Sequence, residues 1–252
     1  MSENISFTIC LADIPIGVAA MFAETKCFCR DYLTDAEPRW SVSVQPEDLA
    51  FERKQDAAAA LREGRTPIAW RDTYLEQLAL YRKIAERLPG ENVLLMHGSV
   101  IAVDGEAFAF TAKSGVGKST HTRLWREHFG TRAVMINDDK PLLRIDGNGV
   151  YAYGTPWDGK HHLSTNAAAP LKGIAFLSRG ETNRIAPVDA QEGFVRLLPQ
   201  CYRPTGAAAT QDTLRLLGEL AETVPFYQLS CNMEPEAAEV AYRGMKGETR
   251  CD

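Results

Sequence analysis

A glycine-rich segment at residues 112–119 contains the residue types that bind phosphate groups. It fits the spacing GxxxxGK[ST], in which backbone N–H groups of a turn surround phosphate oxygens at the start of a helix. The lysine reaches the outer phosphates, and the final hydroxyl binds Mg²⁺. We therefore predict a site for ATP or another nucleoside triphosphate, with Mg²⁺ or Mn²⁺, formed by Ala112, Lys113, Ser114, Gly115, Val116, Gly117, Lys118, Ser119 and Thr120.

The first position of this pattern is irregular, because Ala112 stands where a glycine is usual. Alanine tolerates positive φ poorly, so a chance glycine-rich connection between a strand and a helix is the competing interpretation. The flanks favour the phosphate site. Residues 106–111 are typical of a strand, and a helix is expected to run to about Phe129, where Gly130 ends it.

Two adjacent carboxylates, Asp138 and Asp139, follow an apolar run at residues 133–136 that predicts a buried strand next to the phosphate loop. Beside a triphosphate, one carboxylate can hold Mg²⁺, directly or through water, while the other takes the proton of an attacking hydroxyl. The alternative is a turn at a strand end, where aspartate is common. In combination with the glycine-rich segment, the pair favours catalysis.

Hairpin register brings a histidine near the same segment. An Asp-Gly pair at 104–105 predicts a two-residue turn, so that Val103 faces Glu106. Counting back along both strands sets His97 opposite Ala112, at the mouth of the phosphate loop. A neutral imidazole there could hydrogen-bond a phosphate, ligate a metal or relay a proton, and a structural histidine is an equal alternative.

The same counting applies to a second hairpin, whose loop is expected to take four residues, 146–149. Asp138 then lies near a segment at 154–162. Lys160 in that segment is placed to neutralise a phosphoryl group during its transfer, and an exposed, solvated lysine is the alternative.

The composition limits the class of protein. The chain has 252 residues, of which 45% are hydrophobic and 24% charged, an ordinary globular mix. A net charge of −5 argues against a broad nucleic-acid surface. The N-terminus lacks the basic region of a signal peptide, and no segment is apolar enough to span a membrane. Six scattered cysteines without a zinc-type pattern fit reduced thiols, so we expect a cytoplasmic protein without nucleic-acid or membrane partners.

We expect two parts, a small N-terminal α+β part of unknown role at residues 1–90 and a second domain at 91–252. In the first, residues 49–51 suggest a strand, residues 52–65 an exposed hairpin or a loose helix, and residues 71–88 a helix. The second part alternates strands, hairpins and helices. This order predicts an α/β fold with a mixed sheet and flanking helices.

Three motifs resemble, in order and spacing, the catalytic core of HPr serine kinase/phosphorylase and the nucleotide site of phosphoenolpyruvate carboxykinase. They are Met96-His97-Gly98-Ser99-Val100 before the Asp-Gly hairpin, Ser114-Gly115-Val116-Gly117-Lys118-Ser119, and Asn137-Asp138-Asp139. The resemblance covers residues 92–178, and it is closest to compact bacterial members with a Gly-Thr-Pro-Trp-x-Gly-Lys loop, here residues 154–160. It implies a P-loop core of the HPr-kinase/carboxykinase type.

The resemblance also implies a role for each matching residue. Lys118 and Ser119 match the phosphate-binding lysine and the Mg²⁺-binding hydroxyl. Asp138 matches the general base, Asp139 a metal-binding acid, and His97 an active-site histidine of both families. The chain departs from HPr kinases in lacking the glycine-rich signature after the acids. It is much shorter than the carboxykinases, and no counterpart of their substrate-binding arginines is evident.

The leading hypothesis is an ATP-dependent kinase that moves the γ-phosphate to a hydroxyl, either of a protein or peptide serine or of a small molecule. A carboxykinase-like lyase acting on a small carboxylate is the second hypothesis. A non-catalytic nucleotide sensor, for which Ala112 is a mild hint, is the third. The acceptor, the preferred base and the oligomeric state stay open at this point.

Overall fold

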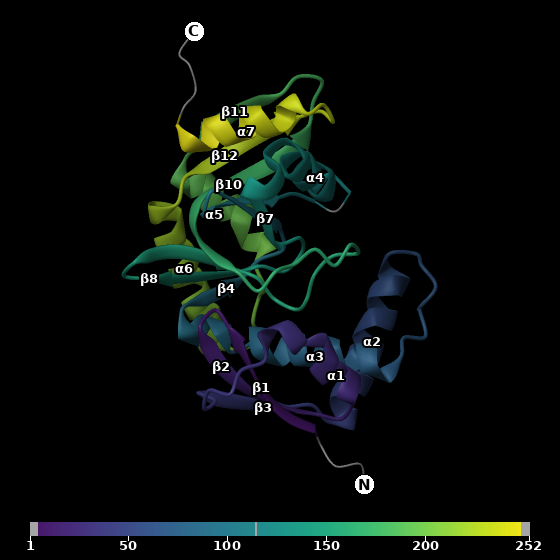
Figure 1. Ribbon diagram of the computed structural model, residues 1–252. Helices are drawn as coiled ribbons and strands as arrows, with labels where there is room; N and C mark the ends of the chain where they lie inside the picture. The colour runs from purple at the N-terminus through teal and green to yellow at the C-terminus, as the bar shows by residue number, and fades with distance from the viewer. Residues whose placement is uncertain (1–4, 114, 248–252) are drawn as a thin grey trace. The chain divides into compact units, whose positions relative to one another are not determined.

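A computed structural model describes residues 5–113 and 115–247. The chain divides into two compact units, Met1–Arg87 and Leu88–Asp252 (Figure 1). Whether the chain functions as two domains with a boundary near residue 90 stays a prediction. Within the described ranges, none of the helices has both the length and the apolar character that crossing a bilayer requires.

The first unit combines a three-stranded sheet with helices. In the sheet order β1-β2-β3, the first pair is antiparallel and the second parallel. Ala12 and Asp13 join β1 to β2 with φ values of 48° and 60°, the positive values that a tight two-residue turn requires. The elements are β1 (Ile5–Leu11), β2 (Ile14–Ala20), α1 (Ala23–Phe28), η1 (Arg30–Tyr32), β3 (Trp40–Ser43), α2 (Pro46–Arg62) and α3 (Asp72–Ala85).

Helix α2 corrects one sequence-based expectation and decides another. The strand expected at 49–51 lies inside this helix. Of the hairpin and the helix expected for residues 52–65, the helix forms, and it ends at Arg62. Pro46 opens the helix, and the Asp48 carboxylate accepts the N–H of Gln45 at 2.9 Å. This capped start outweighs the β-propensity of a short apolar run.

The second unit has a mixed sheet with helices on both faces, which confirms the predicted fold class at that level. Among the described residues the sheet has nine strands, in the order β4-β8-β9-β10-β6-β5-β7, with β12 paired to β10 and β11 paired to β12. The strands are β4 (Val93–Leu95), β5 (Ser99–Val103), β6 (Glu106–Thr111), β7 (Ala133–Asn137), β8 (Leu142–Asp146), β9 (Gly149–Tyr153), β10 (Ala168–Arg179), β11 (Arg184–Val188) and β12 (Phe226–Cys231). The helices are η2 (Leu88–Glu91), α4 (Lys118–Phe129), η3 (Gly130–Arg132), α5 (Ala190–Leu197), η4 (Leu198–Gln200), α6 (Ala207–Thr223) and α7 (Glu236–Lys246).

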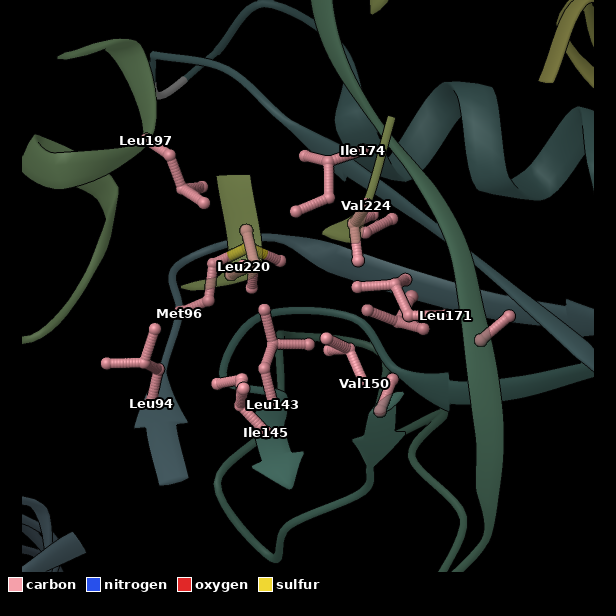
Figure 2. Close-up of a cluster of buried hydrophobic side chains, with 14 of the residues drawn as sticks. Leu94, Met96, Leu143, Ile145, Val150, Leu171, Ile174, Leu197, Leu220 and Val224 are labelled. Carbon is pink, nitrogen blue, oxygen red and sulfur yellow. The ribbon is translucent and has the colours of Figure 1, made fainter. Parts of the chain in front are cut away.

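Side chains alternate between two cores, one on each face of this sheet. In β5, Ile101 and Val103 join a cluster that includes residues of α4 and α7. Their neighbours Val100 and Ala102 join a second cluster with residues of α6 and the β8–β9 hairpin, part of which Figure 2 shows. This two-residue period is what a strand buried on both faces produces.

The direction of three strands determines where the functional loops lie. Strand β5 is antiparallel to both β6 and β7 and lies between them, so β6 and β7 run parallel to each other without touching. The carboxyl ends of β6 and β7 and the amino end of β5 therefore meet at one edge. The acid-bearing strand was expected beside the phosphate-loop strand, and the structure instead places β5 between them.

The two hairpins keep the predicted registers. Val103 pairs with Glu106 around the Asp-Gly turn, as the sequence predicts. In the second hairpin Asp146 itself pairs with Gly149, so the turn has two residues rather than four, although the register is unchanged.

Buried Glu76 of α3 provides a test of the first unit. Its carboxylate accepts hydrogen bonds from the N–H groups of Met21 and Phe22 and from the Thr25 hydroxyl, at the start of α1. We predict that Glu76→Ala lowers the opening free energy of α1 by about 2–4 kcal/mol, because three donors lose their acceptor. Hydrogen exchange of the α1 amides in increasing denaturant measures this. Thr25→Val removes one donor together with its bond and is expected to cost about 1 kcal/mol. Equal costs for both changes would contradict the capping role.

Candidate functional site

The glycine-rich loop connects β6 to α4. Gly115 and Gly117 have φ values of 79° and 128°, and Gly117 directly precedes the first residue of α4. The residues other than glycine that have positive φ in the described chain are Ala12, Asp13, Asn92, Asp104 and His162. Ala112 is not among them, so its backbone does not need a glycine. The loop thus ends at a helix N-terminus, whose unpaired N–H groups and dipole favour an anion.

Lys118, the first residue of α4, folds back over the loop. Its Nζ lies 3.3 Å from the carbonyl oxygen of Ala112 and 3.4 Å from Nε2 of His97. Burial lowers the pKa of Lys118, and the charge of Asp139 partly opposes this effect. The Lys118 ammonium is therefore partly desolvated, and its two contacts are with uncharged groups. A negatively charged phosphate oxygen would bind it more strongly than either of them.

His97 lies just before β5, as the hairpin register predicts. The carbonyl of Gln200 accepts its backbone N–H at 2.7 Å, and the Thr111 hydroxyl donates to its carbonyl at 3.0 Å. Its Nε2 is 3.3 Å from Oδ1 of Asp139, and the same nitrogen is near Lys118. One ring nitrogen cannot donate to a carboxylate and accept from an ammonium at once. If Lys118 moved to contact a phosphate, Nε2 of His97 could carry a proton and donate it in a hydrogen bond to Asp139.

Asp138 and Asp139 are adjacent but have opposite electrostatic surroundings. Burial, followed by the charges of Asp158 and Asp139, raises the pKa of Asp138, although the N–H of Gly159 opposes the rise. Burial also disfavours the charged form of Asp139, but His97 and Lys140 outweigh it and lower the pKa of Asp139 to about 2. One acid therefore has increased proton affinity, and the other holds a permanent negative charge at neutral pH.

Buried Asn137 joins the turn that carries the acids to the following loop. Its side-chain oxygen accepts the N–H groups of Asp139 at 2.9 Å and Lys140 at 2.6 Å. Its amide nitrogen donates to the carbonyl oxygens of Thr155 and Trp157, both at 3.2 Å. These four bonds hold backbone groups, and the amide nitrogen also donates to the Thr155 hydroxyl at 3.1 Å. Asn137 therefore positions the acids without approaching a ligand itself.

Gly159 brings the 154–162 segment against Asp138. Its N–H donates to Oδ1 of Asp138 at 2.6 Å. A Cβ atom at position 159 would lie 2.6 Å from Oδ2 of the same carboxylate, so a glycine is required for this approach. Trp157 of the same segment is buried, which makes it an anchor for the loop.

One cavity of about 580 Å³ brings most of the expected site residues together. Its lining includes His97, Gly115, Gly117, Lys118, Ser119, Thr120, Asp138, Asp139 and Lys160. Ala112, Lys113 and Val116 line a separate hollow beside β10 instead. Ser114 lies outside the described residues.

The donor set at this cavity fits Mg²⁺ shared with a phosphate rather than a site made of protein alone. Within residues 5–113 and 115–247, no group of three or more His, Cys, Asp or Glu side chains could hold a metal ion. Mg²⁺ typically takes one or two protein oxygens and completes its shell with water and phosphate. Ser119 and ionised Asp139 are such donors. Both Asp139 oxygens are already paired, Oδ1 with His97 and Oδ2 with Lys140, which favours contact through water.

Several residues that contribute to the site lie outside the sequence motifs. Lys140 pairs with Asp139 at 2.8 Å. Arg179, at the end of β10, donates to the carbonyl oxygens of Gly115 at 2.6 Å and Val116 at 3.2 Å. By binding these two carbonyl oxygens, Arg179 stabilises the conformation of the glycine-rich loop. Asn137 belongs to the Asn-Asp-Asp motif, which gave it no role, and no local signal in the sequence identifies Arg179.

The opposite pKa shifts of the two acids lead to a stability prediction. The pKa of Asp139 is depressed in the folded state, so ionised Asp139 stabilises the fold above its unfolded pKa near 4, and this contribution is lost as pH falls through about 2. The pKa of Asp138 is raised, so its contribution is favourable at low pH and becomes unfavourable as pH rises through the folded pKa. At pH 7, Asp139→Asn is expected to lower the free energy of unfolding by about 1–2 kcal/mol, allowing for solvent screening, whereas Asp138→Asn is expected to raise it. Urea denaturation measures both, and changes of the same sign would contradict the assignment.

Asn137 provides a second test. Asn137→Ala leaves the N–H groups of Asp139 and Lys140 without their acceptor, and we expect a loss of about 2–4 kcal/mol in the free energy of unfolding. The matched control is Ser99→Ala, which removes one buried hydrogen bond of 2.9 Å to the Asp138 carbonyl and is expected to cost about 1 kcal/mol. A loss for Asn137→Ala no larger than that of the control in urea denaturation would contradict the positioning role.

Comparisons with known proteins give a distant structural likeness and no sequence match. No family model matches the chain, and no curated protein sequence matches it. Among solved structures, the HPr(Ser) kinase/phosphatase from Coxiella burnetii is similar, with a TM-score of 0.36 and 11% sequence identity over 61% of this chain and 97% of that chain. A likeness this weak identifies neither the site residues nor a reaction.

Proposed function

We propose that the second unit is an ATP-dependent phosphotransferase that moves the γ-phosphate to a hydroxyl group. One observation carries this proposal: a single cavity contains a helix N-terminus with Lys118 and two acids of opposite proton affinity, Asp138 and Asp139. The helix N-terminus suits phosphate, and the acid of raised pKa suits a general base. Neither the helix N-terminus alone nor the acid alone would indicate phosphate transfer.

In this proposal the phosphates lie on the backbone N–H groups of residues 115–119. Lys118 leaves the Ala112 carbonyl and His97 to contact the outer phosphates. Mg²⁺ or Mn²⁺, held by Ser119 and Asp139, would supply positive charge to the phosphates when bound. His97 then donates its Nε2–H to Asp139 and keeps that carboxylate ionised.

The transfer step uses Asp138 as the proton acceptor. The acceptor hydroxyl oxygen attacks the γ-phosphorus, and its proton moves to a carboxylate oxygen of Asp138. The bond between the γ-phosphorus and the bridging oxygen breaks, and ADP leaves with the electron pair. The Gly159 N–H holds Asp138 in position, while Lys118 and Lys160 neutralise the charge on the migrating group.

The lining of the cavity favours a neutral acceptor over a carboxylate. Asp138, Asp139 and Asp158 all face it, and no arginine occurs among its described lining residues. A small carboxylate substrate would lack the bidentate partner that arginine provides, and the lysines of the cavity, Lys118 and Lys160, are assigned to the phosphates. This arrangement supports a hydroxyl acceptor and weakens the carboxykinase-like alternative.

Transfer of labelled γ-phosphate tests the proposal. The protein is incubated with labelled ATP and Mg²⁺ together with serine peptides or small alcohols, and transfer to the acceptors, to the chain itself and to water is measured. We expect Asp138→Asn to lower transfer by about 10²-fold or more while ATP affinity changes little, because only the base is lost. Lys118→Ala is expected to weaken ATP binding itself.

The controls separate the three hypotheses. Asp138→Asn is expected to be more stable than the parent, so lost transfer would not reflect misfolding. Equal transfer by this variant would rule out Asp138 as the base. ATP binding without transfer to any acceptor would favour a sensor. Mn²⁺-dependent exchange of CO₂ with oxaloacetate would favour the lyase.

A further inference from the structure

A second cavity, of about 450 Å³, adjoins the glycine-rich loop. It shares Gly115, Gly117 and Thr120 with the cavity that contains the acids, so the two cavities adjoin along the loop. The sheet order puts β7, which leads to the acids, on one side of β6, and β10 and β12 on the other. The second cavity lies at the carboxyl ends of β10 and β12, where ligands of α/β sheets commonly bind.

The lining of this cavity differs in character from that of the first. Leu177, Cys231 and Met233 contribute apolar surface, and no carboxylate occurs among the described residues that line it. Its cation is Arg179, whose Nε and Nη2 are bound to loop carbonyls. These two bonds fix the plane of the guanidinium, and the face of such a plane stacks well on aromatic rings. Apolar surface with one fixed planar cation suits a flat aromatic group better than a sugar chain or a second phosphate.

We propose that this cavity binds the base and ribose of the nucleoside triphosphate. The inference rests on the proposed function, because a γ-phosphate that faces Asp138 and Lys160 directs the other end of the nucleotide away from β7. That direction leads across Thr120 to Arg179 and Met233. Arg179 then couples the two halves of the site, because the guanidinium that meets the nucleoside also holds the carbonyls of the phosphate loop.

Thiol protection tests the location directly. Cys231 lines the cavity, and Cys27, which is exposed in the first unit, provides an internal control. Burial raises the pKa of Cys231, so alkylation with iodoacetamide is done at about pH 9 and followed by peptide mass spectrometry. At ten times its dissociation constant, ATP is expected to slow alkylation of Cys231 about tenfold. Inorganic tripolyphosphate, which lacks a nucleoside, is expected to leave it unchanged, and neither ligand is expected to affect Cys27.

A substitution provides an independent readout. Met233 is 76% exposed, so Met233→Ala should not disturb folding. It is expected to weaken ATP binding several-fold and to leave tripolyphosphate binding unchanged. Leu214→Ala is the matched control, because Leu214 is an exposed apolar residue of α6 that does not line the cavity.

The outcomes separate this inference from the proposed function. If ATP and tripolyphosphate bind equally well and ATP does not protect Cys231, the nucleoside subsite is wrong while the phosphate loop stands. If neither ligand binds, the proposed function fails, and the subsite fails with it. Protection by ATP alone, together with a selective loss in Met233→Ala, would support both.

Discussion

The antiparallel direction of β5 between β6 and β7 is the constraint on which the site depends. Because β5 runs against both neighbours, the loop after β6, the turn after β7 and the residues before β5 open at one edge of the sheet. His97, Lys118 and the two acids come from these three segments. A direct pairing of β6 with β7 would keep the loop and the acids at one edge but would remove His97 from between them.

Groups gathered at this edge would repel one another without a network that distributes their charge. Asp139 is paired on both oxygens, whereas Asp138 receives the Gly159 N–H and remains in a partly desolvated position. Asp139 thus has the cationic and hydrogen-bonding partners that keep a carboxylate charged, and among the described residues Asp138 lacks cationic partners of this kind. The raised pKa of Asp138 costs stability at neutral pH, as is common for groups arranged for proton transfer. Asn137 holds the backbone of the turn that carries the acids and the backbone of the following loop, and so positions both acids.

Strand β10 links this edge to the rest of the second unit. It pairs with β9 at residues 168–170, with β6 from Leu171 onward, and with β12 over its final residues. Its last residue, Arg179, reaches the glycine-rich loop. The loop is therefore supported from β10 as well as by its own glycines, which is consistent with an alanine at its first position.

Local signals in the sequence determined much of this architecture. The glycine-rich spacing, the helix that Gly130 ends and the register of both hairpins depend on turn chemistry and periodicity within about a dozen residues, and each of these elements appears where the sequence predicts it. Register alone was enough to bring His97 to the loop. The strand predicted from the short apolar run at 49–51 was wrong, because the capped start of α2 lies outside that run.

Only the tertiary structure decided which distant groups complete the site. Arg179 is 64 residues from Gly115, and its contact exists because β10 pairs with β6 in a parallel register. Likewise, β12 rather than β11 lies beside β10. The order of the strands and the opposite environments of Asp138 and Asp139 depend on which side chains are buried, and burial is decided by the packing of the whole fold. A sequence motif, in contrast, depends only on its own residues.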